Sequence, residues 1–237
     1  MNSMQNAMTR RSVVKGAAVL GAATAMGSLL PGTASAAPKK DEEQPKKLPV
    51  SANGWTIEKE ANNVSTVWTR TVAGTGLKVD VRIGDAEALL LHVVRRFHYE
   101  IEQLSAVDLA GWRAIEGLRK DRPESNLASG TAVRVRPGAS AEGGLFEFQE
   151  LVLRDILADC EGVVRWGGDD KQVDESLFYL DGGPDDERIK NAADKIRLWD
   201  ETPSAGAGVA VDVQAPTRRS RADRLAGTQR SGGVTAR

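Results

Sequence analysis

The sequence predicts an α+β domain in which helices pack against a small, mostly antiparallel sheet. Three observations lead to this prediction. Two β-branched runs flank a glycine-containing turn, three later segments repeat apolar residues at steps of three and four, and short apolar runs separate those segments. Strands and helices in this mixed order are typical of helices that cover an antiparallel sheet.

The first two predicted strands, residues 64–71 and 77–83, are joined by Ala73-Gly74-Thr75-Gly76. A short turn with glycine between two β-branched runs is a hairpin signal. We interpret the glycine pair as part of this turn and not as a phosphate-binding loop, because no helix follows it directly. Further short strands are expected over residues 132–136, 163–166 and 177–180.

Three segments have the periodicity of amphipathic helices, namely residues 86–99, 148–160 and 185–199. We expect Asp85 to cap the first helix, and Asp185 and Asp186 suit the positive N-terminal end of the third. The apolar positions that recur at helical spacing are Leu89, Val93 and Phe97; Leu151, Val152, Ile156 and Leu157; and Ile189, Ala192, Ala193, Ile196 and Trp199.

Composition divides the rest of the chain. Residues 37–50 are rich in Pro, Lys and Glu and poor in apolar side chains, so burial cannot offset the entropy of ordering and a flexible linker is expected. Residues 51–200 have the usual size of one domain with one core. From residue 201 onward Gly, Ala, Ser, Thr and Arg dominate, which predicts a disordered basic tail over residues 201–237.

The N-terminal segment resembles a twin-arginine export signal. Thr9-Arg10-Arg11-Ser12-Val13-Val14-Lys15 supplies the arginine pair, and a mildly apolar stretch over residues 16–30 is shorter than the roughly 20 residues that span a bilayer. Ala34-Ser35-Ala36 offers the small residues that a signal peptidase needs. We therefore expect residues 1–36 to be a cleaved signal peptide, the twin-arginine translocase to be a partner during export, and the location to be extracellular or associated with the cell wall.

Charge and cysteine content narrow the range of partners. The chain has a net charge of −1, and loss of residues 1–36 would remove three basic residues and no acidic one, giving about −4. A nucleic-acid-binding domain would show a clustered basic excess, so no nucleic acid is expected as partner. The single cysteine, Cys160, excludes an intrachain disulfide, and its place at a helix end favours a buried apolar role over a reactive thiol.

Three blocks follow one another in the domain. They are Gly111-Trp112-Arg113, the run SNLASGTAVR over residues 125–134, and Trp166-Gly167-Gly168-Asp169 followed by DESLF over residues 174–178. Their order and spacing resemble the family of zinc D-alanyl-D-alanine carboxypeptidases and L-alanyl-D-glutamate endopeptidases. The resemblance covers roughly residues 86–199 and implies the hedgehog-type α+β fold of that family.

The resemblance implies a zinc site with two histidines, an aspartate and a carboxylate that acts as general base. At the ligand positions this chain has Leu127, Arg134 and Leu177, and at the position of the base it has Asp174. Leucine has no lone pair, and arginine stays protonated and cationic. We therefore expect no bound metal, no other cofactor and no catalytic residue at these degenerate positions.

Ligand contacts are expected around the same positions. The family's arginine before the metal motif, which binds the substrate or its oxyanion, corresponds to Arg113. Alternation over residues 132–136 places Arg134 on the face where the family holds its metal, and a buried guanidinium needs a carboxylate, either Asp174 or Glu175. Arg134 then either captures an anionic ligand such as a stem-peptide carboxylate or only pairs internally. The candidate ligand-binding residues are Arg113, Ser125, Arg134, Trp166 and Asp174.

These observations predict an exported, catalytically inactive relative of the zinc carboxypeptidases that binds peptidoglycan stem peptides or serves as a scaffold at the cell wall. Two alternatives stay open. One is an active cell-wall hydrolase with a metal-free site built on Arg113, Arg134 and Asp174. The other is a protein-interaction module that uses the old cleft or the basic tail. The sequence indicates no oligomeric state.

Overall fold

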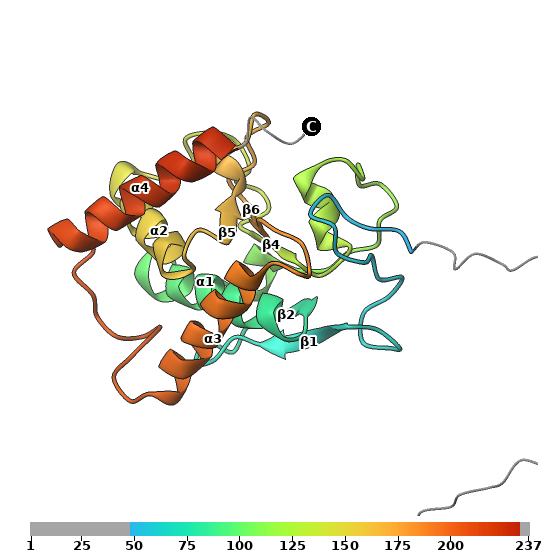
Figure 1. The fold of residues 1–237 in the computed structure, drawn as a ribbon, viewed down its shortest axis with the longest axis horizontal. Coiled ribbons are helices and arrows are strands. Elements are labelled where there is room, and N and C mark those ends of the chain that lie inside the picture. Colours follow the sequence, from blue (N-terminus) through green and yellow to red (C-terminus); the bar gives the residue numbers. More distant parts are fainter. Residues whose placement is uncertain (1–47, 233–237) are drawn as a thin grey trace, which may run out of the picture. The chain divides into compact units, whose positions relative to one another are not determined.

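The computed structural model describes residues 48–232, so the predicted signal peptide and residues 37–47 of the predicted linker lie outside the described residues. Within that range the chain forms four α-helices and two small antiparallel sheets (Figure 1). The predicted α+β class is therefore confirmed. None of the described helices is long and apolar enough to cross a membrane.

The predicted hairpin consists of β1 (Val67–Thr71) and β2 (Lys78–Arg82), paired antiparallel with Val67 opposite Arg82. Its turn contains Gly74 and Gly76 with φ of 80° and 75°, a left-handed conformation that glycine adopts without steric cost. Val79 and Val81 alternate toward the core, as the period of a half-buried strand requires. The two strands form a sheet of their own, separate from the four-stranded sheet.

The second sheet has the order β3-β4-β6-β5, and all its pairs are antiparallel. Its strands are β3 (Leu109–Ala110), β4 (Ala132–Val135), β5 (Val164–Trp166) and β6 (Leu177–Leu180). All four residues of β6 are buried, because this strand lies between β4 and β5. The two-residue strand β3 was not predicted, since so short a run carries no alternation.

The predicted helices are α1 (Asp85–Glu100), α2 (Glu147–Asp159) and α3 (Glu187–Glu201). Asp186 caps α3 by accepting a hydrogen bond from the backbone of Arg188. The expectation that Asp85 caps α1 was wrong, because Gly84 occupies the cap position. Asp85 instead binds Arg197 of α3 at 2.6 Å and ties the two helices together.

One hydrophobic core connects these elements. Helix α1 contacts α2, α3 and the strands β2, β4 and β6. Its buried residues Leu89, Leu90 and Val93 meet Phe178 of β6 and Ile196 of α3 in a single cluster. Burial of such side chains contributes about 1.5–3 kcal/mol each and accounts for most of the stabilisation of the fold.

The predicted disordered tail was wrong for residues 216–232, which form the helix α4 (Pro216–Gly232) beside α2 (Figure 1). The helix has no apolar stripe, and composition alone therefore gave no sign of it. Polar contacts hold it in place: Arg218 donates to Asp155 at 2.8 and 2.6 Å. Gln229 donates to the carbonyls of residues 162 and 164 at 2.9 and 2.8 Å.

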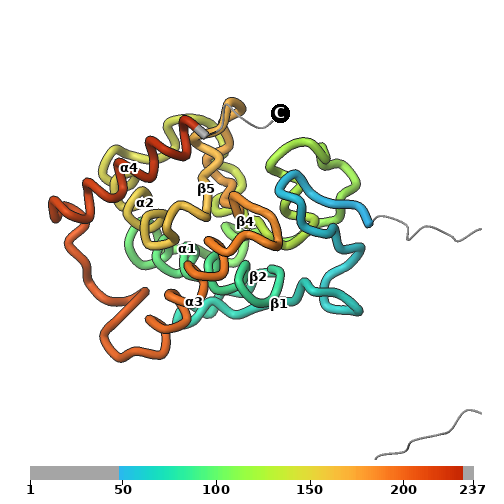
Figure 2. The backbone as a smooth tube through the Cα atoms, viewed as in Figure 1, coloured from blue at the N-terminus to red at the C-terminus, as the bar shows by residue number. Residues whose placement is uncertain are grey.

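The described N-terminal segment lies beside the loop that precedes β4 (Figure 2). Ser51 donates a hydrogen bond to Ser129, and the backbone of Asn53 donates to the side chain of Asn126. Asn53 reaches further and donates to Thr131 and to the carbonyl of Leu180. Through these bonds residues 51–53 become part of one wall of a cavity.

Candidate functional site

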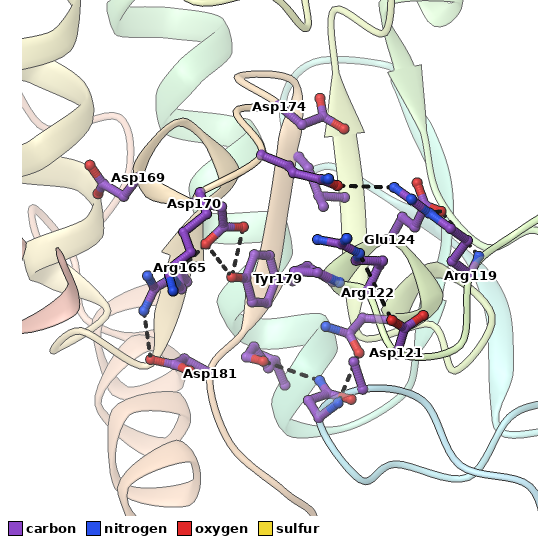
Figure 3. A pocket seen from close by; sticks show the side chains of 18 of the residues that line it. Arg119, Asp121, Arg122, Glu124, Arg165, Asp169, Asp170, Asp174, Tyr179 and Asp181 are labelled. Atoms are coloured by element: carbon purple, nitrogen blue, oxygen red, sulfur yellow. Dashed lines mark hydrogen bonds and ion pairs between the residues drawn. The ribbon is translucent and has the colours of Figure 1, made fainter. Parts of the chain in front are cut away.

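A cavity of about 770 Å³ lies over β6. One wall consists of residues 52–53 and the segment 119–126, and the other consists of residues 165–182 (Figure 3). Arg230 of α4 lies at its edge. The lining is rich in charged side chains of both signs, namely Arg119, Asp121, Arg122, Glu124, Arg165, Asp169, Asp170, Lys171, Asp174, Asp181 and Arg230.

Part of the floor of the cavity is apolar. Leu177 and Tyr179 alternate toward it along β6, and both line the cavity. Leu127, at the end of a 3-10 helix formed by Pro123–Leu127, packs with Leu177, Ala132 and Tyr179 in a small buried cluster. Leu127 and Leu177, which the sequence resemblance aligns with zinc-binding histidines, therefore belong to one buried apolar cluster from which water is excluded.

Arg134 is the third residue that the sequence resemblance aligns with a zinc ligand. It lies opposite Leu177 in the pairing of β4 with β6, which places the two side chains on one face of the sheet. Its Nη1 donates to Asp174 Oδ2 at 2.5 Å and to Ser176 Oγ at 2.8 Å. The predicted contact between Arg134 and Asp174 is confirmed. Glu175, the other candidate, accepts backbone hydrogen bonds at residues 143 and 144 instead.

A second polar group, formed by Asp170, Tyr179 and Arg165, lies at the same floor (Figure 3). The Tyr179 hydroxyl donates to Asp170 Oδ1 at 2.9 Å, and Arg165 Nε donates to the same oxygen at 3.0 Å. Burial raises the pKa of Asp170 in spite of these donors. Burial and the neighbouring carboxylate of Asp170 also raise the pKa of Tyr179, which therefore stays a hydrogen-bond donor.

Asp169 connects the cavity wall to α4. Arg154 of α2 holds it through both carboxylate oxygens, and Arg230 Nε donates to Oδ1 at 3.0 Å. Burial alone would raise the pKa of Asp169, but these two arginines outweigh burial and lower it. The Arg154 guanidinium also stacks over Trp166, 4.9 Å from the ring centroid.

The glycine pair between Trp166 and Asp169 has a packing reason. A Cβ at Gly167 would lie 2.4 Å from the carbonyl oxygen of Asp174, and one at Gly168 would lie 2.4 Å from the Trp166 ring. The turn can close only without those side chains. This closure brings the loop that carries Asp174 back over the end of β5.

Of the predicted contact residues, Asp174 lines the cavity, whereas Arg134 and the remaining three lie outside its lining. Ser125 is fully buried, donates to the carbonyls of Lys120 and Arg122, and accepts from the backbone of Ala52. Trp166 is buried, and its indole donates to the Glu175 carbonyl at 2.8 Å. Arg113 is exposed and is not among the residues that line the cavity. Ser125 and Trp166 thus position the two walls, and their assignment as ligand contacts finds no support in this geometry.

The site offers neither the usual nucleophiles nor, among the described residues, a group of side chains arranged to bind a metal ion. Among residues 48–232 no group of three His, Cys, Asp or Glu side chains is arranged to hold a metal ion. The cavity lining contains no His, Cys, Ser or Thr. His98 accepts a backbone hydrogen bond from Leu104 at the end of α1. Cys160 is fully buried as expected, and burial raises the pKa of its thiol to about 12.

No protein-family model, curated protein or solved structure matches this chain.

Sequence reasoning missed most of the cavity's charged residues. Tyr179 could have been found, because it stands two residues after Leu177 and shares its face of the strand. Arg165 lies opposite Tyr179 in the pairing of β5 with β6, a relation that only the register reveals. Arg122 and Asp181 lie in loops with no motif around them, so no sequence signal indicates their position.

Proposed function

We propose that the protein is an exported, catalytically inactive relative of the zinc D-alanyl-D-alanine carboxypeptidases that binds cell-wall stem peptides in the cavity over β6. Export rests on the twin-arginine segment, and the family relation rests on the three sequence blocks. The ligand class follows from the cavity, whose volume of about 770 Å³ and charges of both signs suit a short polar peptide.

One observation carries the proposal. The positions that hold zinc in the family lie together and are filled by protein contacts: Leu127 and Leu177 pack in one cluster, and Arg134 pairs with Asp174. The cavity beside them stays open. A site that lost its metal ligands but kept its cleft is suited to binding and not to hydrolysis.

A metal-free hydrolase is the second candidate, and Asp170 is the observation that favours it. A carboxyl group whose pKa is raised by burial in a cavity is a candidate general acid. A metal-free site built on Arg113, Arg134 and Asp174 is not supported by the geometry. Arg113 is exposed outside the cavity lining, and Asp174 is held by Arg134 and Ser176.

Sedimentation of the purified protein with isolated peptidoglycan tests the proposal, together with an assay for release of D-alanine. We expect binding without turnover. Ala52→Trp, which places a bulky ring at the cavity wall, should abolish binding, whereas Ala141→Trp on an exposed loop outside the lining should not. D-alanine release that Asp170→Asn removes would favour the hydrolase. Binding that Ala52→Trp leaves intact would favour an interaction module that uses another surface.

A further inference from the structure

The charged side chains of the cavity differ in how far the protein itself satisfies them. Asp174 is held by Arg134 and Ser176, and Asp170 is held by Tyr179 and Arg165. These carboxylates already accept two or more strong hydrogen bonds. A ligand would have to displace a protein partner to bind them, and each displacement leaves a buried group unpaired.

Arg122 and Asp181 have no such partners. The nearest opposite charge to Arg122 is Asp121, whose carboxylate lies 3.9 Å away and is 82% exposed. The nearest opposite charge to Asp181 is Arg165 Nη1, also 3.9 Å away, while Arg165 Nε is engaged with Asp170. Among residues 48–232 neither side chain makes a hydrogen bond. Both are only partly exposed, so a ligand that enters the cavity would remove water from them.

The backbone at both positions is nevertheless fixed. The carbonyl of Arg122 accepts from Ser125 through both the backbone N–H and the hydroxyl group, at 2.9 and 2.8 Å. The backbone N–H of Asp181 donates to the carbonyl of Val163 at 2.9 Å. A charged side chain on a fixed backbone loses little conformational entropy when it binds a ligand. This property is expected of a residue that recognises a ligand.

The two residues belong to opposite walls. Figure 3 shows Arg122 on the wall that carries Arg119 and Glu124, Asp181 on the wall of Arg165 and Asp170, and Tyr179 between them. The remaining charges without close partners, Lys171 and Asp121, are exposed and therefore screened by solvent.

We propose that the cavity binds a dipolar peptide, with its carboxylate on Arg122 and its ammonium group on Asp181. This inference rests on the proposed function, because it assigns two ends to the ligand of the same cavity. A planar guanidinium can bind a carboxylate through two parallel hydrogen bonds, and a carboxylate is the matching acceptor for an ammonium group.

The experiment uses a lysine-containing stem pentapeptide in three forms: unmodified, with a C-terminal amide, and with both amines acetylated. Calorimetry at low salt gives the Kd of each form for the wild-type protein and for Arg122→Gln, Asp181→Asn and the control Lys171→Gln. We expect the wild-type protein to bind the amidated peptide about tenfold more weakly than the unmodified peptide. Arg122→Gln should bind the unmodified peptide about tenfold more weakly than wild type does, and amidation should then cause no further loss. The acetylated peptide and Asp181→Asn should behave in the same way, so that the two losses do not add. Lys171→Gln should change the Kd by less than about threefold.

Further variants keep the outcomes separate. Arg122→Lys retains the charge but loses the planar fork, so its Kd should lie between those of wild type and Arg122→Gln. Equal binding of all three peptide forms would overturn the dipolar assignment and leave the proposed function standing. The dipolar assignment would also be overturned if the loss of affinity caused by a peptide modification added in full to the loss caused by the matching substitution. Absence of binding for every form would overturn the proposed function, and the assignment with it.

Discussion

Two clusters of charged side chains in this molecule differ in how completely their charges are paired. Between α1, α2 and α4, Arg96 is 2% exposed and donates to Glu100, Asp155 and Asp159, and Arg218 adds a second cation. In the cavity over β6, Arg122 and Asp181 lie 3.9 Å from their nearest opposite charges. The first cluster is internally complete and serves stability. The second is incomplete within the protein, and our proposal is that an external ligand completes it.

Replacement of Arg96 should have the largest effect. Arg96→Ala would leave Asp155 and Asp159 buried without their central cation, and the loss of a buried partner costs about 3–5 kcal/mol of unfolding free energy. Chemical denaturation measures this change. Arg70→Ala, which breaks an ion pair whose arginine is 46% exposed, is the control and should cost less than about 1 kcal/mol. If Arg96→Ala and Arg70→Ala lowered the unfolding free energy equally, the helix cluster would stabilise the fold no more than a surface ion pair does.

Loss of Arg218 should have the next largest effect. Arg218 is partly exposed, so Arg218→Ala should lower the unfolding free energy by about 1–2 kcal/mol. It should also release α4 and speed proteolysis in the connection over residues 202–215. Arg219→Ala changes an exposed neighbour on the same helix and should do neither. If both variants resist protease equally, α4 is held by its buried residues Ala222, Ala226 and Gln229 and not by Arg218.

Acid should weaken the helix cluster. Burial alone would raise the pKa of Asp159, but His92, Arg96 and Arg218 together lower it. A carboxyl group with a lowered pKa stabilises the fold above its unfolded pKa of about 3.9, and this stabilisation is lost as the pH falls through the folded value. Thermal unfolding followed from pH 7 to pH 3 should therefore show Tm falling below about pH 4. A smaller fall in Asp159→Asn would assign part of this loss to Asp159, and an unchanged profile would contradict the assignment.

Arg134 should show an intermediate to small effect. Its side chain is 18% exposed and that of Asp174 is 21% exposed, so Arg134→Met should cost about 1 kcal/mol. A double-mutant cycle with Asp174→Asn isolates the pair, and we expect a coupling of about 0.5–1 kcal/mol. A coupling near zero would show that Ser176 satisfies Asp174 without the arginine.

Arg122→Gln and Asp181→Asn should have the smallest effect on stability. Neither side chain has a close partner to lose, so each change should lie within about 0.5 kcal/mol of wild type. If the denaturation curves of both variants superimpose on that of the wild type while peptide binding is weakened, these two cavity charges serve binding and not stability. A loss above about 1 kcal/mol in either variant would place that residue with the stabilising cluster.

The sequence predicted elements whose cause is local. The hairpin, the three amphipathic helices and the strands β4, β5 and β6 follow from periodicity and turn residues, with boundaries displaced by at most three residues. Strand alternation and the need of a guanidinium for a carboxylate predicted that Arg134 contacts Asp174 or Glu175, and the structure shows that the partner is Asp174.

What the sequence could not predict depends on contacts distant in the chain. Helix α4 is docked by Arg218 and Gln229 onto α2 and the start of β5, and those partners are about 60 residues away in sequence. The pairing of Arg165 with Tyr179 needs the strand register. The weak pairing of Arg122 and Asp181, each 3.9 Å from its nearest opposite charge, depends on what surrounds them in space, and no residue pattern encodes it.

Asp169 and Asp170 are consecutive in the chain, yet they face different neighbours. Asp169 is bound to Arg154 of α2 and Arg230 of α4, whereas Asp170 is bound to Tyr179 and Arg165 of the sheet. A short 3-10 turn over Gly167–Asp169 produces this division. A substitution at residue 170 therefore removes hydrogen bonds within the sheet side of the cavity, whereas one at residue 169 removes the ion pairs that attach α4.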